Sequence, residues 1–341
     1  MSFFKKQLII DGQIVGEDSP VYIIAEAGIS HFGDEKKAYE LVDMAVDAGV
    51  NAVKFQVFDI DEMIVKEQTD WRERLGPRQL SYEAFSRIQK YCIKKGITFF
   101  ATAHDNQSLD FLHDINIPVY KIGSGELGNE QYFRKIAKYK KPVIFSTGMY
   151  QFDEIGSALK IFEKEGNDDI AVLHCVTSYP TPPEDVSLLN IRAIADRYKV
   201  IAGYSDHTAE YHLPLAAVAL GAKIIEKHIT LDFDIPNAQD WKVSCGPKNL
   251  SIFVQQVRDI EKALTLRDTG PTVEEKKSKI WATKSLVLES SMLKGDIIKE
   301  QSLVAKRPGS GISPSKINDV IGKKINNNLE KDSILQWKHI Q

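Results

Sequence analysis

Eight short apolar runs alternate with amphipathic segments along most of the chain, and no other feature limits its fold as strongly. The runs cover residues 21–27, 52–58, 98–103, 119–122, 143–146, 170–175, 200–204 and 224–227. Segments with helical spacing follow them at 35–48, 81–95, 108–114, 131–138, 152–163, 189–197, 213–220 and 250–264. Near-continuous apolar strands joined through helices are typical of a parallel sheet buried on both faces. Eight pairs predict an α/β fold of the closed (β/α)8 TIM-barrel type, and an open doubly wound sheet is the alternative.

Two smaller parts flank this region. Asp11 and Gly12 are a turn signal between residues 8–10 and 13–15, which predicts a hairpin. The chain turns polar and charged from 265 to 280, as linkers do. We therefore expect a barrel domain at residues 1–268, a linker at 269–283 and a small domain at 284–341. A domain that small buries little surface, so we expect it to dock on the barrel or on a partner subunit.

Composition excludes several classes of partner. A formal net charge of -3 gives no electrostatic reason to expect nucleic acid or an anionic membrane. No signal peptide is apparent, and no stretch approaches the roughly 20 apolar residues of a membrane span, so we expect a cytoplasmic protein. Cys92, Cys175 and Cys245 have unrelated spacings, which argues against a disulfide framework or a zinc site. We expect Cys175 to be a small buried apolar residue, because no histidine or asparagine marks it as a nucleophile.

Charged residues lie at the strand ends, where barrels of this type build their active sites. Glu26 is a carboxylate among apolar neighbours, suited to general acid/base work or else neutralised by a core lysine. Lys54 and Lys121 lie in interior strands, where unpaired lysines are rare. They predict an anion pocket completed by Ser124, and the alternative is that each pairs with Glu26 or Glu126.

Two histidines follow neighbouring strands. His207 and His228 should lie close together and can hold one divalent ion, with Glu226 on the same strand face as His228. Thr102 and Ser146 end two other strands and are suited to phosphate or carboxylate oxygens, although such residues are also plain helix caps.

Two loops carry further candidates. The proline-rich loop at 176–183 is stiff enough to hold Tyr179 over a substrate, or is only a structural turn. Arg307 lies in a loop of the small domain that is rich in proline and glycine. The loop is either a solvated basic turn or a segment that crosses a dimer interface to close the pocket of the partner subunit.

Taken in order, these motifs resemble the sialic acid synthase family over nearly the whole chain, including the small domain, which is similar to that family's antifreeze-like (SAF) domain. The matching segments are Ile24-Ala25-Glu26-Ala27-Gly28, Val53-Lys54-Phe55-Gln56, Lys121-Ile122-Gly123-Ser124-Gly125-Glu126, Ser146-Thr147-Gly148-Met149, His174-Cys175, Tyr179-Pro180-Thr181-Pro182, Ser205-Asp206-His207-Thr208, Glu226-Lys227-His228 and Lys306-Arg307-Pro308-Gly309.

The resemblance implies condensation of phosphoenolpyruvate with an N-acetylmannosamine-like aldehyde to give a nonulosonic acid and phosphate. It implies that His207 and His228 bind Mn²⁺ or Mg²⁺, and that Glu26 is the base at the cationic centre. Donor-binding residues by resemblance are Lys54, Thr102, Lys121, Ser124, Ser146 and Ser205. Acceptor-binding residues by resemblance are Gln56, Glu126, Tyr179 and Asp240. Arg307 would come from the partner in a domain-swapped homodimer.

The chain departs from the family pattern in three loops on the acceptor side. The usual Asn-His-Asn-Gly-Asp is Ser30-His31-Phe32-Gly33-Asp34, and the usual Thr-Pro-Phe-Asp is Thr102-Ala103-His104-Asp105. The third departure is Ala238-Gln239-Asp240-Trp241 in place of Gly-Pro-Asp-His. The acceptor therefore stays open among N-acetylmannosamine, a diacetamido 6-deoxyhexose and a 6-phosphate. We expect a free sugar, because no cluster of Arg or Lys for a second phosphate stands out.

Two other functions remain as alternatives. A Schiff-base aldolase or lyase of a keto acid would use Lys121 as its nucleophile and need no metal. A non-catalytic carbohydrate-binding protein could keep the barrel without the chemistry, since fold does not secure function.

Overall fold

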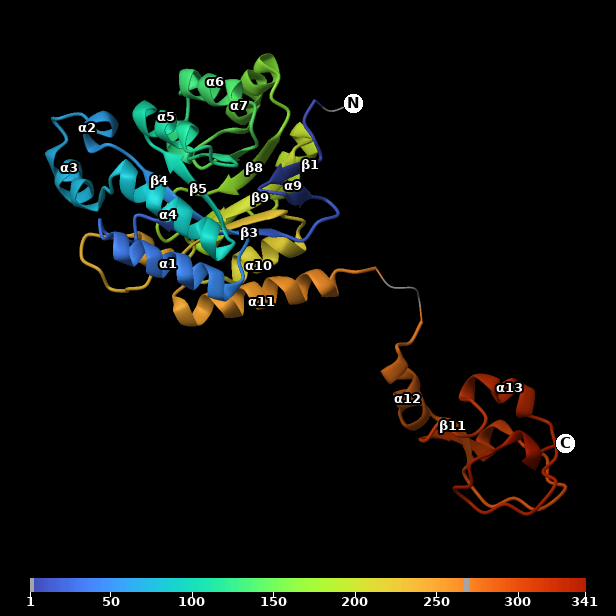
Figure 1. Cartoon of the computed structure of the whole chain (residues 1–341). Helices are drawn as coiled ribbons and strands as arrows, with labels where there is room; N and C mark the ends of the chain where they lie inside the picture. Colours follow the sequence, from blue (N-terminus) through green and yellow to red (C-terminus); the bar gives the residue numbers. More distant parts are fainter. Residues whose placement is uncertain (1–2, 267–269) are drawn as a thin grey trace. The chain divides into compact units, whose positions relative to one another are not determined.

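A computed structural model of the chain describes residues 3–266 and 270–341, which divide into two compact units at Thr265 and Leu266 (Figure 1). The expected boundary between 268 and 269 lies outside the described residues. Within the described ranges, no helix has both the length and the apolar content needed to cross a membrane. The expected cytoplasmic location stays a prediction.

Eight parallel strands form a closed barrel in the first unit, in the order β10-β3-β4-β5-β6-β7-β8-β9. This confirms the predicted TIM-barrel architecture and rules out the open sheet. The barrel strands are β3 (Tyr22–Gly28), β4 (Ala52–Val57), β5 (Thr98–Ala103), β6 (Tyr120–Ile122), β7 (Val143–Ser146), β8 (Ile170–Cys175), β9 (Ile201–Asp206) and β10 (Ile224–His228). Every barrel strand residue except Gln56 is buried, as expected for strands covered by helices outside and side chains inside.

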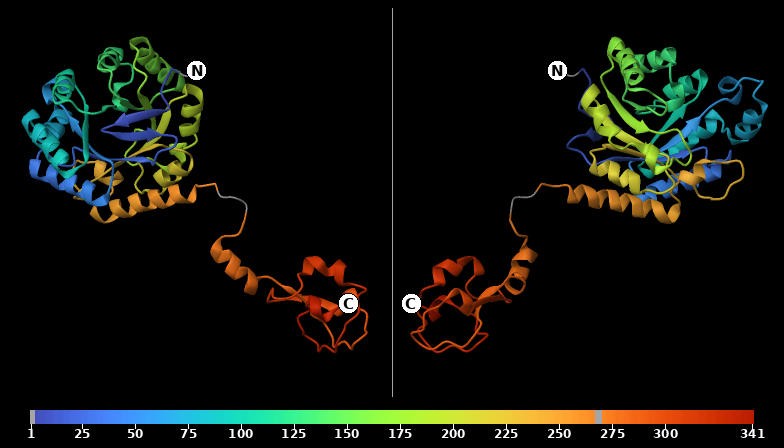
Figure 2. Two further views of the ribbon diagram at one scale, coloured as in Figure 1. Left: turned by 45° about the vertical axis from the view of Figure 1, so that its right-hand side comes forward. Right: turned by 180° about the vertical axis from the view of Figure 1, so that it is seen from behind.

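Helices surround the strands in both views of Figure 2. They are α1 (Glu35–Ala48), α2 (Ile60–Met63), α3 (Thr69–Leu75), α4 (Tyr82–Lys95), α5 (Asn106–Asp114), α6 (Glu130–Lys138), α7 (Phe152–Glu165), α8 (Pro183–Val186), α9 (Asn190–Tyr198), α10 (His212–Ala219) and α11 (Pro247–Ala263). All eight predicted helices are present with ends shifted by a few residues. The short α2, α3 and α8 were not predicted, because segments of four to seven residues show little periodicity.

Local signals fix the helix ends. Asp34 and Ser81 cap the starts of α1 and α4 by accepting from backbone N–H groups. Gly49 and Gly96 end the same helices at φ of 74° and 73°, a left-handed conformation that glycine adopts without a Cβ clash. Both ends of α1 and α4, and so the points where the chain enters and leaves these helices, are therefore defined by residues in the sequence.

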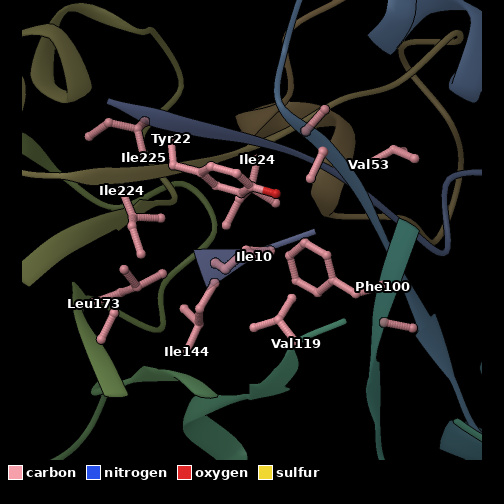
Figure 3. Close-up of a cluster of buried hydrophobic side chains, with 14 of the residues drawn as sticks. Ile10, Tyr22, Ile24, Val53, Phe100, Val119, Ile144, Leu173, Ile224 and Ile225 are labelled. Atoms are coloured by element: carbon pink, nitrogen blue, oxygen red, sulfur yellow. The ribbon is translucent and has the colours of Figure 1, made fainter. Parts of the chain in front are cut away.

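The predicted hairpin is present as β1 (Gln7–Ile10) and β2 (Gln13–Gly16), paired antiparallel. It lies against the amino ends of two strands, since Thr98 Oγ1 donates to Asp11 Oδ2 at 3.0 Å and Asn51 Nδ2 donates to Gln13 Oε1 at 2.7 Å. Figure 3 shows Ile10 among apolar side chains of the barrel interior. The hairpin thus covers the amino end of the barrel, and the carboxyl end is left for the site.

The second unit has its own apolar core around a two-stranded sheet of β11 (Ser285–Leu288) and β12 (Leu303–Lys306). The core residues are Leu286, Leu288, Met292, Ile298, Ile312, Val320, Leu335, Ile325 and Ile340. A short helix α13 (Ile317–Val320) belongs to this unit. The segment expected as a linker contains helix α12 (Val273–Ala282), which starts with a capping box between Thr272 and Glu275. The domain limits themselves stay predictions.

Candidate active site

A cavity of about 140 Å³ opens at the carboxyl end of the barrel, and all eight strands or the loops after them contribute to its lining. Eleven of the fourteen predicted site residues line it, and three do not. The eleven are Glu26, Lys54, Gln56, Thr102, Lys121, Ser124, Ser146, Tyr179, Ser205, His207 and His228. The remaining three are Glu126, Asp240 and Arg307. The position of this cavity is where barrels of this type carry chemistry.

Strand register explains why these side chains meet. Glu26 lies directly opposite His228 on one side and Lys54 on the other. Thr102 pairs in the same way with Gln56 and with Lys121. Inward positions of neighbouring strands therefore form a continuous polar ring above the apolar barrel core.

Two buried carboxylates and two buried lysines form the centre of the cavity. Lys54 Nζ lies 2.7 Å from Glu26 Oε2 and 3.6 Å from Glu226 Oε2. Lys121 Nζ lies 3.6 Å from Glu226 Oε1 and donates to Ser146 Oγ at 2.7 Å. Glu226 also accepts from Ser205 Oγ at 2.9 Å. The alternative of lysine–carboxylate pairing thus holds for Lys54 with Glu26, whereas Lys121 does not pair with Glu126.

Burial separates the protonation behaviour of the two carboxylates. Burial raises the pKa of Glu26 above its ordinary value, although Lys54 acts in the opposite direction. Burial also acts to raise the pKa of Glu226, but Lys121 and Lys54 outweigh it and lower that pKa to about 2. Glu226 therefore stays ionised near neutral pH, and Glu26 is the one of the two whose pKa moves toward neutral pH, as proton exchange requires.

The two lysines shift in opposite directions. The pKa of Lys54 is raised, because Glu226 and Glu26 outweigh the effect of its burial. Burial lowers the pKa of Lys121 despite the attraction of Glu226. A permanent cation and a more readily deprotonated amine therefore share the cavity.

The turn after β6 brings the hydroxyl of Ser124, and the loop after β7 brings the backbone N–H of Gly148, to the same wall of the cavity. Gly148 N donates to Ser124 Oγ at 2.9 Å. A Cβ at Gly148 would lie 2.2 Å from Thr177 Oγ1 and 2.8 Å from Ser124 Oγ, so no side chain fits there. The glycine lets two loops approach closely beside Lys121 and Ser146.

His207 and His228 lie side by side with ring centroids 5.4 Å apart. His207 Nδ1 lies 2.7 Å from the carbonyl oxygen of Val176, which orients the ring and, when Nδ1 carries the proton, leaves a lone pair on Nε2. Nε2 lies 3.0 Å from the hydroxyl of Tyr179. Nδ1 of His228 is buried without a hydrogen-bond partner in the described chain, and burial lowers the pKa of that ring to about 3. Neutral imidazole is the form that binds metals, and His228 is in that form. Burial acts to lower the pKa of His207, but Cys175 and the carbonyl oxygen of Val176 outweigh it and raise that pKa to about 9, so a metal ion would displace a proton from this ring.

These two rings fit a divalent ion that takes its other ligands from water or substrate. Among residues 3–266 and 270–341, no group of three or more His, Cys, Asp or Glu side chains is arranged to hold a metal by itself. A site of this kind has open positions, as Lewis-acid catalysis requires. The metal role of His207 and His228 stays a proposal.

The prediction for Cys175 was right about burial and wrong about its surroundings. Its sulfur lies 3.7 Å from His207 Nδ1 and faces the cavity. Burial alone would raise the pKa of the Cys175 thiol, but His207 outweighs it and the pKa is lowered. The contact joins residues 32 positions apart on neighbouring strands, which sequence spacing does not show.

The three predicted residues outside the lining have other surroundings. Glu126 ends a short 3-10 turn (Ser124–Glu126), accepts from Asn129 at 2.7 Å, and has its pKa raised by burial. Asp240 begins another such turn (Asp240–Val243) and acts electrostatically on His228. Arg307 follows β12 in the second unit and is exposed.

The cavity also contains side chains that were not predicted as site residues. Thr177, Cys175 and His104 line it, as does Glu226, which the sequence placed only on the same strand face as His228. Strand alternation could have found His104, because it lies two residues beyond Thr102 in the same strand direction. Thr177 lies in the loop after β8, and in a loop the sequence has no strand or helix period from which the direction of a side chain could be predicted.

The chain matches the model of the NeuB family over residues 41–268 and that of the SAF domain over residues 283–341. It belongs to the NeuB family. This confirms the resemblance to sialic acid synthases, and the second unit is the expected SAF domain.

Relatives in the NeuB family share most of their length with this chain. The N,N'-diacetyllegionaminic acid synthase of Legionella pneumophila is 35% identical, over 96% of this chain and 96% of the relative. The human N-acetylneuraminate-9-phosphate synthase is 32% identical, over 95% of this chain and 94% of the relative. A crystal structure of the N-acetylneuraminic acid synthetase of Leptospira borgpetersenii, in complex with citrate, superposes with a TM-score of 0.74 at 34% identity. That match covers 80% of this chain and 94% of the other.

Proposed function

We propose that this protein condenses phosphoenolpyruvate with the open-chain aldehyde of an N-acetylmannosamine-like sugar, giving a nonulosonic acid and phosphate. One observation carries the proposal: Lys54 and Lys121 face the same buried cavity as Glu26, His207 and His228. The cations suit an anionic donor, the carboxylate suits proton transfer, and the imidazoles suit an electrophilic site. The family names of the relatives support the product class.

The donor is held by the lysines and the hydroxyls around them. Lys54 and Lys121 would neutralise its carboxylate and phosphate. Hydroxyl donors on the same walls would complete its hydrogen bonds, and they are Thr102, Ser124, Ser146 and Ser205. When the anion binds, Lys54 has a new partner in competition with Glu26, which releases that carboxylate for proton transfer.

The reaction forms one carbon–carbon bond, and at the second carbon of the donor it replaces the bond to the phosphate oxygen by a bond to the oxygen of water. The methylene carbon of the donor attacks the aldehyde carbon, and the aldehyde oxygen takes a proton to become a hydroxyl. Water adds to the donor's cationic second carbon while Glu26 accepts its proton. The bond between that carbon and the phosphate oxygen then breaks, and the new hydroxyl gives its proton to the departing phosphate, which leaves the keto acid and inorganic phosphate. What Mn²⁺ or Mg²⁺ would supply at His207 and His228 is polarisation of the aldehyde oxygen.

The acceptor would contact residues on the outer side of the cavity. Gln56 and Tyr179 already line it, and Glu126 and Asp240 would join them around the sugar. Arg307 of the partner subunit would meet the acyl group of the sugar in a domain-swapped homodimer. The relatives described above are named for different products, so the acceptor is proposed as a class, a free 2-acetamido or 2,4-diacetamido hexose.

Release of phosphate from phosphoenolpyruvate tests this function. We expect release that depends on both Mn²⁺ and one sugar from a panel of 2-acetamido and 2,4-diacetamido hexoses. Glu26→Gln and His207→Ala should each reduce the rate by roughly 10²- to 10⁴-fold, as loss of a catalytic group does. Glu40→Gln, which changes an exposed carboxylate on α1, is the matched control and should keep full activity. Absence of release with every sugar, in a protein that binds the panel's sugars, would favour a non-catalytic binder.

One observation favours the Schiff-base alternative enough to test it. The lowered pKa of Lys121 is what an amine nucleophile needs. Borohydride reduction in the presence of pyruvate would then fix a covalent adduct on Lys121, detectable by mass spectrometry. The proposed synthase should give no adduct, because its lysine only binds the donor.

A further inference from the structure

His104 faces the cavity as the next inward residue beyond the end of β5. Its backbone N–H donates to the carbonyl oxygen of Val57 at 3.1 Å, so the ladder between β4 and β5 continues one residue past Ala103. Alternation along an extended strand then places Phe100, Thr102 and His104 on one side. The lining of the cavity includes both Thr102 and His104.

The charges around His104 are those of the lysine side of the cavity. Burial lowers the pKa of its imidazole to about 4; Lys54 and Lys121 act in the same direction, and Asp105 acts against them. The ring is therefore neutral near pH 7 and carries one N–H donor and one acceptor nitrogen. The lysines that add to the effect of burial on this ring are the same ones that would attract an anionic ligand.

The carboxylate of Asp105 bonds to other groups, so pairing with Asp105 does not account for the presence of a histidine at position 104. Its carboxylate accepts from Ser108 N at 2.7 Å, from Ser108 Oγ at 2.6 Å and from Asp59 N at 2.8 Å. These bonds cap α5 and tie down the loop after β4. The ring of His104 is thus available to the cavity rather than needed for the cap.

We propose that His104 is a donor-binding residue, whose neutral imidazole gives a hydrogen bond to an anionic oxygen of phosphoenolpyruvate held between Lys54 and Lys121. This inference rests on the proposed function and adds a residue to its donor site. A ring that only filled space would be replaced by phenylalanine without loss.

Two variants separate a hydrogen bond from packing. His104→Phe keeps an aromatic ring and removes the N–H, whereas His104→Gln keeps a donor at the far end of the side chain. We expect the KM for phosphoenolpyruvate to rise roughly ten- to a hundredfold in His104→Phe, the range for a bond to a charged group. The KM for the sugar should change less than twofold, and His104→Gln should recover part of the loss.

Calorimetric titration of the native protein and both variants with phosphoenolpyruvate, without sugar, gives the matching dissociation constants. Equal dissociation constants for the native protein and a folded His104→Phe would overturn the role of His104 and leave the proposed function standing, provided that the native protein releases phosphate. A native protein that neither binds phosphoenolpyruvate nor releases phosphate would overturn both. Equal thermal melting of the native protein and His104→Phe shows that the variant is folded.

Discussion

Lys227 and Asp206 form a buried ion pair on the face of β9 and β10 opposite to the one that carries His207 and His228. The two side chains are 1% and 0% exposed. Lys227 Nζ also donates to the carbonyl oxygens of Thr208 at 2.7 Å and Glu210 at 3.0 Å. Asp206 accepts from Thr208 N at 3.1 Å. The pair therefore fixes the turn on which His207 lies.

Lys227→Met should weaken both the fold and the metal site. It leaves Asp206 buried without its cation, which costs about 3–5 kcal/mol of unfolding free energy. Because the turn loses its anchor, we expect Mn²⁺ affinity of the folded variant to fall roughly 10- to 100-fold. Urea unfolding and Mn²⁺ titration followed by electron paramagnetic resonance measure the two effects.

Lys223→Met is the matched control, since Lys223 is a half-buried lysine that donates to the carbonyl oxygen of Glu17 at 2.6 Å and lies outside the cavity. We expect its Mn²⁺ affinity to equal that of the native protein. The double variant Lys227→Met with Asp206→Leu should recover part of the lost stability, because it removes the unpaired charge. Native Mn²⁺ affinity in a folded Lys227→Met would show that the pair does not position His207.

The second prediction concerns Tyr179, whose hydroxyl lies 3.0 Å from the His207 nitrogen that we assign to the metal. Metal binding must displace this hydrogen bond. Tyr179→Phe should therefore bind Mn²⁺ as tightly as the native protein or up to about tenfold more tightly, given the usual net value of one hydrogen bond. The KM of this variant for the sugar should rise, because the Tyr179 hydroxyl contacts the sugar in the proposed complex.

Calorimetric Mn²⁺ titration checks this, with His207→Ala as the variant that should lose the site. Prior dialysis against a chelator should abolish phosphate release, and added Mn²⁺ should restore it. Weaker Mn²⁺ binding in Tyr179→Phe would mean that the hydroxyl supports the metal instead of competing with it.

Much of this architecture could be predicted from the sequence, because strand and helix periods are local. The barrel order followed from the eight alternating runs, and the cavity residues followed from the rule that barrel sites lie at strand ends. Lys54 and Glu26 were recognisable as a possible pair because lone buried charges are rare.

The missed features depend on register and on loops. Cys175 meets His207 only because Cys175 is opposite Ser205 in the β8–β9 ladder. Lys227 meets Asp206 for the same reason in the next ladder. A sequence shows which residues alternate, but not which residue of the neighbouring strand stands opposite. Loop residues such as Thr177 have no period at all.

The third prediction is a pH dependence of stability caused by His31, which is fully buried in the loop after β3. Its Nδ1 accepts from Gly33 N at 3.1 Å, and burial lowers the pKa of the ring from 6.5 to about 4. The unfolded chain therefore binds a proton that the folded one does not between these values. Stability should be full above pH 6.5 and should be lost as the pH falls toward 4.

His31→Asn keeps an acceptor for Gly33 and removes the titration. We expect the variant to be less stable at pH 7.5 but to lose less on acidification, by up to about 1.4 kcal/mol per pH unit between pH 6 and 5. Urea unfolding at several pH values gives the two curves. Parallel curves for the native protein and the variant would exclude His31 as the source of the slope.

The fourth prediction tests whether Arg307 completes the partner's site. Arg307→Ala and Glu26→Gln should each be nearly inactive as homodimers. If the site combines the barrel of one subunit with Arg307 of the other, a mixed dimer of the two variants has one intact site. Random reassembly of equal amounts should then restore about a quarter of native activity, because half of the dimers are mixed and half of their sites are intact. A mixture of Lys306→Ala and Glu26→Gln is the control, because Lys306 is the neighbouring exposed cation and its ion-pair partner, Asp332, lies in its own unit. This control mixture should show only the activity of its Lys306→Ala subunits. Activity in the Arg307→Ala and Glu26→Gln mixture that stays at the sum of the separate variants, with mixed dimers detected by native mass spectrometry, would mean that Arg307 does not act across subunits.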